Sequence, residues 1–200
     1  MALTKISNNS LSAISSLPAS IPTGALTLLS TQTASASASI EFTSGLDSTY
    51  SSYIFEMIDI HPETNGSNIT FQCSTDSGST YATTVTSTYF QAFHFENDSG
   101  ANLEYAAAKD LAQSTSFQNI ATGIGSDNDQ NYGGSLQLYN PSSDTFVKHF
   151  IVNGNSADAS DITINQIPAG YFNTTSAIDA IQFKMSSGNF DGIIKMYGVS

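Results

Sequence analysis

The chain has 200 residues, with 17 acidic residues, five lysines and no arginine, so its formal net charge is −12 at pH 7. A chain this acidic is repelled by phosphate groups, which excludes a nucleic-acid-binding protein and disfavours binding to anionic membrane surfaces. The lack of arginine argues against enzymes that hold phosphate or carboxylate substrates with a bidentate guanidinium. We therefore expect neither nucleic acid nor a membrane among the partners of this protein.

Serine and threonine dominate the composition, with 32 and 21 residues, whereas charged residues make up only 11%. An average soluble domain has roughly 25% charged residues, and its surface helices draw on alanine, leucine, glutamate, lysine and arginine. Twelve phenylalanines and nine tyrosines are available to build a core. A low-charge chain rich in threonine and aromatic residues favours strands, so the composition predicts an all-β protein.

Residues 1–39 differ from the rest of the chain, because they contain no aromatic and no acidic residue. We predict that they form an extended N-terminal attachment arm and that residues 40–200 form the folded domain. Within the arm, residues 31–40 alternate alanine and serine, which fits a strand; a free linker is the alternative. The aliphatic residues predicted to make the attachment are Leu3, Ile6, Leu11, Ile14, Leu17 and Ile21.

From residue 40 onward, stretches of β-branched and aromatic residues alternate with turn signals, giving about ten strands together with residues 31–40. The last two, residues 177–185 and 193–199, are expected to form a hairpin turned at residues 186–189. Residues 103–112 contain three consecutive alanines and predict a short helix. No βαβ pattern occurs, so we predict an antiparallel β-sandwich of jelly-roll type. The remaining predicted strands cover residues 53–60, 69–73, 81–87, 88–96, 134–139, 145–152 and 162–167.

Metal and catalytic motifs are weak. Cys73 is the only cysteine, and it is predicted to be a buried strand residue. Residues 127–131 begin like a calcium loop, but Tyr132 stands where an EF-hand needs glycine; a looser cation site is the alternative. We therefore predict no catalytic residue, no metal and no cofactor. Three histidines lack metal-site spacing and are predicted to be surface or half-buried strand residues: His61, His94 and His149.

Residues 74–81 fit the pattern S-x-D-x-G-x-x-aromatic and resemble the Asp-box turn of sialidases. In this pattern Asp76 bonds backbone amides ahead of it, and Gly78 takes a positive φ. The catalytic arginine cluster of sialidases is excluded here, because the chain has no arginine. We therefore interpret the motif as a structural turn.

Four aromatic residues near turn signals are candidates for contact with a glycan. The alternative is that they belong to the core or its rim. They are Tyr132, Tyr139, Tyr171 and Phe172.

Several segments resemble known virion proteins. The start, Ala2-Leu-Thr-Lys-Ile-Ser, resembles the start of tailed-phage fibre and accessory virion proteins. The segments 40–50, 146–150 and 193–199 (IEFTSGLDSTY, FVKHF and IIKMYGV) resemble small virion proteins of aquatic bacteriophages. The resemblance implies a surface-exposed β-sandwich on a phage particle, often a trimer, without saying where on the particle.

Together these observations predict a non-enzymatic virion structural protein, made in the host cytoplasm and displayed on the particle surface. We favour a capsid decoration or cement role, because the chain has no fibrous shaft repeat. The close alternative is a short tail fibre or receptor-binding module that recognises a host surface glycan. A polysaccharide depolymerase is the third hypothesis. Expected partners are further copies of the chain, as a trimer, and other capsid or tail proteins.

Overall fold

The computed structural model describes residues 25–199, which form twelve β-strands and no helix. The predicted all-β, antiparallel class is therefore confirmed. The strands are β1 (Leu26–Ser37), β2 (Ile40–Phe42), β3 (Ser52–Pro62), β4 (Ser67–Ser74), β5 (Val85–Phe95), β6 (Ala101–Tyr105), β7 (Gln118–Ile124), β8 (Tyr132–Tyr139), β9 (Lys148–Asp158), β10 (Ile162–Phe172), β11 (Ala180–Met185) and β12 (Phe190–Val199).

Eight of these strands build a jelly roll. One layer has the order β1-β12-β3-β8, and the other has the order β2-β11-β4-β7. All neighbours within each layer are antiparallel. Along the chain these eight strands switch layers at every step except from β4 to β7, which is the double-sheet arrangement of a jelly roll.

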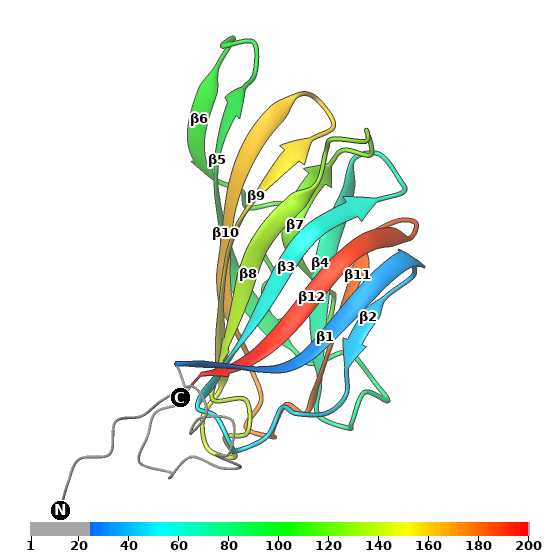
Figure 1. The fold of residues 1–200 in the computed structure, drawn as a ribbon. Helices are drawn as coiled ribbons and strands as arrows, with labels where there is room; N and C mark the ends of the chain where they lie inside the picture. Colours follow the sequence, from blue (N-terminus) through cyan, green and yellow to red (C-terminus); the bar gives the residue numbers. More distant parts are fainter. Residues whose placement is uncertain (1–24, 200) are drawn as a thin grey trace, which may run out of the picture.

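The remaining four strands extend the first layer beyond β8, in the order β9-β10-β5-β6. One residue pair, Ile124 with Asp158, joins β7 to β9, so the two layers nearly close into a barrel on that side. The hairpins β5–β6 and β9–β10 project past the jelly roll, and the β5–β6 tip lies at the end of the molecule opposite the end of β12 (Figure 1).

Phenylalanine rings hold the two layers together. Phe55 of β3 and Phe183 of β11 come from opposite layers, and their ring centroids are 5.4 Å apart. Phe71 of β4 meets Phe150 of β9 edge-on at 5.0 Å. These four side chains are 0–1% exposed, so burial of apolar area and aromatic contact geometry both stabilise the sandwich.

One buried tyrosine is matched to two glycines. Gly134 and Gly154 lie opposite each other across β8 and β9. A Cβ atom on either glycine would collide with the Tyr132 hydroxyl. The ring of Tyr132, which is fully buried, therefore fits only because both opposite positions lack a side chain.

The strand interpretation of residues 31–40 is confirmed for β1, since β1 pairs with β12 from Leu26 to Ser37. The linker alternative does not hold there. The sheet begins at Leu26 rather than at residue 40, so residues 26–37 belong to the sandwich and not to the arm. The physical reason is that backbone hydrogen bonds to β12 hold this segment, although its small side chains bury little apolar area.

Three local predictions are wrong. The predicted separate strands 81–87 and 88–96 are one continuous strand, β5, which begins at Val85. Residues 103–112 form no helix: Leu103 lies in β6, and the Ala106 amide donates to the Tyr89 carbonyl at 2.9 Å. Backbone hydrogen bonds to the edge of β5 thus hold the start of this segment in an extended form, despite the helix propensity of the three alanines. The last two strands form no hairpin either, since β11 pairs with β4 and β2 while β12 pairs with β1 and β3. The turn at residues 186–189 carries the chain from one layer to the other.

Candidate functional site: the outward face of the extended layer

The outward side of β8, β9, β10, β5 and β6 carries no lysine and no carboxylate. These strands contain three such residues, Lys148, Asp158 and Glu104, and all three occupy inward positions of the alternating pattern. Lys148 is fully buried, and its Nζ donates to the Thr174 carbonyl at 3.1 Å. In a chain of net charge −12, an outward surface five strands wide is thus left free of fixed charge. We call this surface the uncharged face.

Large apolar side chains project from the uncharged face. The register places Ile167 of β10, Phe90 of β5 and Tyr105 of β6 in one row across neighbouring strands. The Phe90 and Tyr105 rings meet edge-on at 5.2 Å. Contiguous apolar side chains at this exposure mark interaction surfaces. The exposed members are Phe90 (47%), Leu103 (74%), Tyr105 (46%), Ile151 (46%) and Ile167 (40%).

A groove of about 450 Å³ crosses β9, β10 and β5 on this face. Its middle strand, β10, contributes the small residues Ala169 and Gly170, which leave a hollow, and Tyr171, which bounds the hollow at one end. On the β9 side, the ring of His149 lies 5.9 Å from the ring of Tyr171. The other outward residues that line it are Thr86, Thr88 and Ile151.

A buried polar network supports the face from beneath. Gln166 of β10 is fully buried; its Oε1 accepts from the Tyr89 hydroxyl and, at 2.8 Å, from the Thr122 amide. The Lys109 amino group donates to the Thr122 hydroxyl at 2.6 Å and to Gln91 Oε1 at 2.8 Å. Burial lowers the pKa of Lys109 and raises the pKa of Tyr89. Such satisfied networks rigidify the strands that they join, so the face is a preformed surface.

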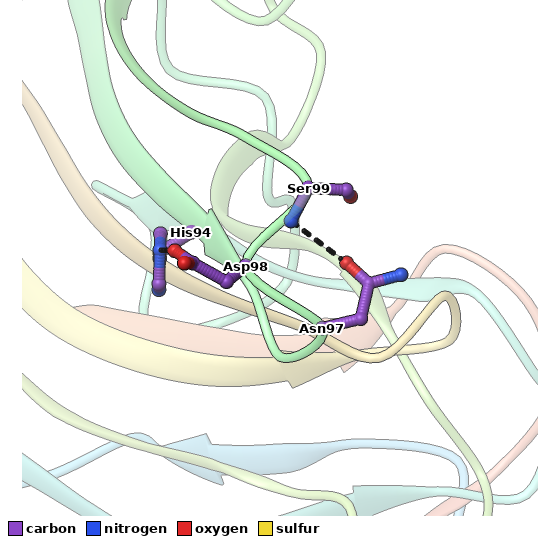
Figure 2. A network of polar contacts seen from close by, with 4 residues as sticks. All are labelled: His94, Asn97, Asp98 and Ser99. Carbon is purple, nitrogen blue, oxygen red and sulfur yellow. Dashed lines mark hydrogen bonds and ion pairs between the residues drawn. The ribbon is translucent and has the colours of Figure 1, made fainter.

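The three histidines lie on separate strands, as surface or half-buried residues, which confirms the prediction for them. His94 Nε2 lies 3.1 Å from Asp98 Oδ1 at the tip of the β5–β6 hairpin, where the Ser99 amide also donates to Asn97 Oδ1 (Figure 2). His61 Nδ1 lies 2.7 Å from the Gln130 carbonyl oxygen. Within residues 25–199, no group of three or more potential ligands could hold a metal ion.

The four predicted glycan contacts are not brought together. Tyr132 and Phe172 are fully buried, so they cannot touch a ligand, and this prediction is wrong for both. Each points inward because the alternation along its strand places it on the core side. Tyr139 is half-buried at the end of β8 and does not line the groove. Tyr171 does line it, beside His149, a contact that the sequence analysis did not select.

The Asp-box resemblance is confirmed as a turn. Asp76 Oδ1 accepts from the Thr80 amide at 2.9 Å and from the Ser74 hydroxyl at 2.6 Å. Gly78 has a φ of +82°. These hydrogen bonds lower the pKa of Asp76.

Cys73 is buried in β4, as predicted, and burial raises the pKa of its thiol. A buried protonated thiol behaves as a small apolar residue.

In the loop 127–131, Asn131 Nδ2 donates to Asp59 Oδ1 at 3.1 Å, and the Gln130 amide donates to the Asp127 carbonyl at 2.9 Å. The loop is thus tied to the chain by its own polar groups.

The six predicted arm residues, from Leu3 to Ile21, lie outside the described residues. No helix among residues 25–199 is suited to crossing a membrane. No protein-family model, curated protein or solved structure matches this chain.

Proposed function

We propose that this chain is a non-enzymatic structural protein of a bacteriophage virion, displayed on the particle surface as a capsid decoration or cement protein. The observation that carries the proposal is the jelly roll formed by the layers β1-β12-β3-β8 and β2-β11-β4-β7. Jelly rolls recur in viral capsid and lectin domains, so this support is an analogy of architecture. The resemblance of segments 40–50, 146–150 and 193–199 to phage virion proteins adds to it.

The arm would make the attachment. Residues 1–24 precede β1 and contain six aliphatic residues among small polar ones. A fully buried aliphatic side chain contributes about 1.5–3 kcal/mol, and several arms on one oligomer would add avidity. We assign attachment to other virion proteins to this segment and display to the sandwich.

Localisation on particles tests the proposal. Purified particles of the phage that encodes the chain would be labelled with gold-conjugated antibodies raised against residues 25–199. Label spread over the capsid is expected for decoration, and label confined to the tail would favour the fibre alternative. If the protein is missing from purified particles by both labelling and mass spectrometry, the virion proposal fails.

A second candidate function is recognition of a host surface glycan, and the groove favours it. Tyr171 and His149 present aromatic rings beside outward threonine hydroxyls, which suits a sugar with one apolar face. Binding to host polysaccharide would be measured for Tyr171→Ala, with Tyr139→Ala as the matched control outside the groove. Loss of binding in the first variant alone supports this function. If both variants bind as well as the unmodified chain, the groove is not the glycan-binding site.

A further inference from the structure

The uncharged face needs a partner that explains both its apolar side chains and its lack of charge. We propose that the face is the surface through which copies of this chain associate with one another. This inference goes beyond the proposed function and does not depend on it, because self-association can be measured without a particle.

The distribution of charge favours a second copy of the chain as the partner that binds the uncharged face. Each copy carries a formal net charge of −12, so two copies repel one another over most of their surfaces. The uncharged face is a broad area where two acidic molecules can meet without bringing carboxylates together. A basic partner would find no carboxylate on this face to pair with, whereas a second copy presents an equally neutral surface. Depletion of charge together with exposed aromatic residues is the composition of an interface core.

The size of the face is sufficient for association. Five strands spaced about 4.8 Å apart span about 24 Å, and about eight residues per strand span about 26 Å, so the face covers on the order of 600 Å². A standard protein interface buries roughly 800 Å² on each partner. With its rim included, the face therefore has the dimensions of one side of a stable interface.

The shape of the face also suits a second copy. Leu103, the most exposed apolar side chain of the face at 74%, projects from β6. The groove over Ala169 and Gly170 lies two strands away on the same surface. A face that carries both a projecting side chain and a hollow can be complementary to itself, as an interface between identical chains requires. Leu103 of one copy would enter the groove of the next.

The test measures oligomeric state by sedimentation equilibrium and light scattering on the full chain, from about 1 to about 100 μM. Leu103→Glu places a carboxylate on the face at a position that is already 74% exposed, so the fold is not expected to suffer. Ile167→Glu, at a position 40% exposed, is the second variant. The matched control is Phe146→Glu, 67% exposed on the β8–β9 connection and outside the face. Circular dichroism checks that all variants are folded.

We expect the unmodified chain to sediment as a multiple of its 21.1 kDa mass. Both face variants should raise the dissociation constant at least tenfold, while Phe146→Glu should leave it unchanged. A monomeric unmodified chain at all concentrations would overturn the proposal. So would oligomers that survive both face substitutions, or that are lost equally in the control. The proposal would also be overturned if the chain is monomeric and Leu103→Glu abolishes its binding to host polysaccharide. The uncharged face would then be a glycan-binding surface.

Discussion

The hydroxyl groups of Tyr132 and Tyr89 are both buried, but only one of them is paired. Among the described residues, the Tyr132 hydroxyl has no hydrogen-bond partner, while the Tyr89 hydroxyl donates to Gln166 Oε1. We expect Tyr132→Phe to leave the free energy of unfolding unchanged or to raise it, because it removes an unsatisfied polar group. Tyr89→Phe should lower it by about 1 kcal/mol, since a buried hydrogen bond is lost. Urea unfolding of the two variants checks this, and equal losses would contradict it.

The lowered pKa of Asp76 makes the stability of the folded chain depend on pH. The Ser74 hydroxyl and then the Thr80 amide lower its pKa below the usual 3.8. The carboxylate therefore stabilises the folded state fully above pH 3.8, and this contribution is lost as the pH falls through the lower folded pKa. We expect Asp76→Asn to melt at a lower temperature than the unmodified chain at pH 7 and to lose less on acidification. Melting curves from pH 7 to pH 2 measure both effects, with Asp129→Asn at an exposed loop position as the control.

At the scale of the element, β1 separates the arm from the sandwich. Deleting residues 1–25 leaves β1 intact, so we expect a folded chain with a nearly unchanged melting temperature that no longer binds particles. Deleting residues 1–39 also removes β1 and exposes the β12 edge. This larger deletion should lower the melting temperature by at least about 5 °C, because each kcal/mol shifts it by about 2–4 °C at this size.

Circular dichroism melts and incubation with particles that lack the protein measure both deletions. If the chain lacking residues 1–25 fails to fold, the arm belongs to the core. If that chain folds and still decorates particles at normal occupancy, attachment lies on the sandwich.

The fold class could be read from the sequence because side-chain alternation is a local signal. Phe150 and Val152 alternate with His149 and Ile151 in β9, and burial follows this pattern residue by residue. Strand partners are not local. The same turn residues 186–189 suit a hairpin or a crossing between layers, and only the distant strands β4 and β3 decide between them. Strand β7 was missed because its run is short and contains Gly123, whose φ is +75°.

The candidate site was only partly predictable. Tyr171 could be selected, because it is aromatic and near a turn signal. His149 joins it through the pairing of β9 with β10, which no local pattern reveals. The uncharged face is harder still to predict, because it depends on the register of five strands from separate parts of the chain. Tyr132 was misplaced because its neighbours Gly133 and Gly134 resemble a turn, whereas Gly134 makes room for its ring.

At the scale of the whole molecule, charge opposes association while the uncharged face favours it. Raising the ionic strength shortens the distance over which the −12 charges of two copies repel each other, to about 10 Å at 0.1 M salt. Self-association should therefore tighten with added salt, and an interface held by ion pairs would weaken instead. Sedimentation at low and high sodium chloride distinguishes the two outcomes, and Phe146→Glu should show the same salt dependence as the unmodified chain.

The pairing of Leu26 with Val199 places the first and last strands of the sandwich side by side, at the end of the molecule away from the β5–β6 tip (Figure 1). The domain thus has two distinct poles. The start of β1 and the end of β12 both lie at the pole opposite the tip, so a fusion made directly at either strand end begins away from the tip. The turn at residues 96–99 is correspondingly the place to open the chain in a circular permutant, with a short linker joining the paired ends.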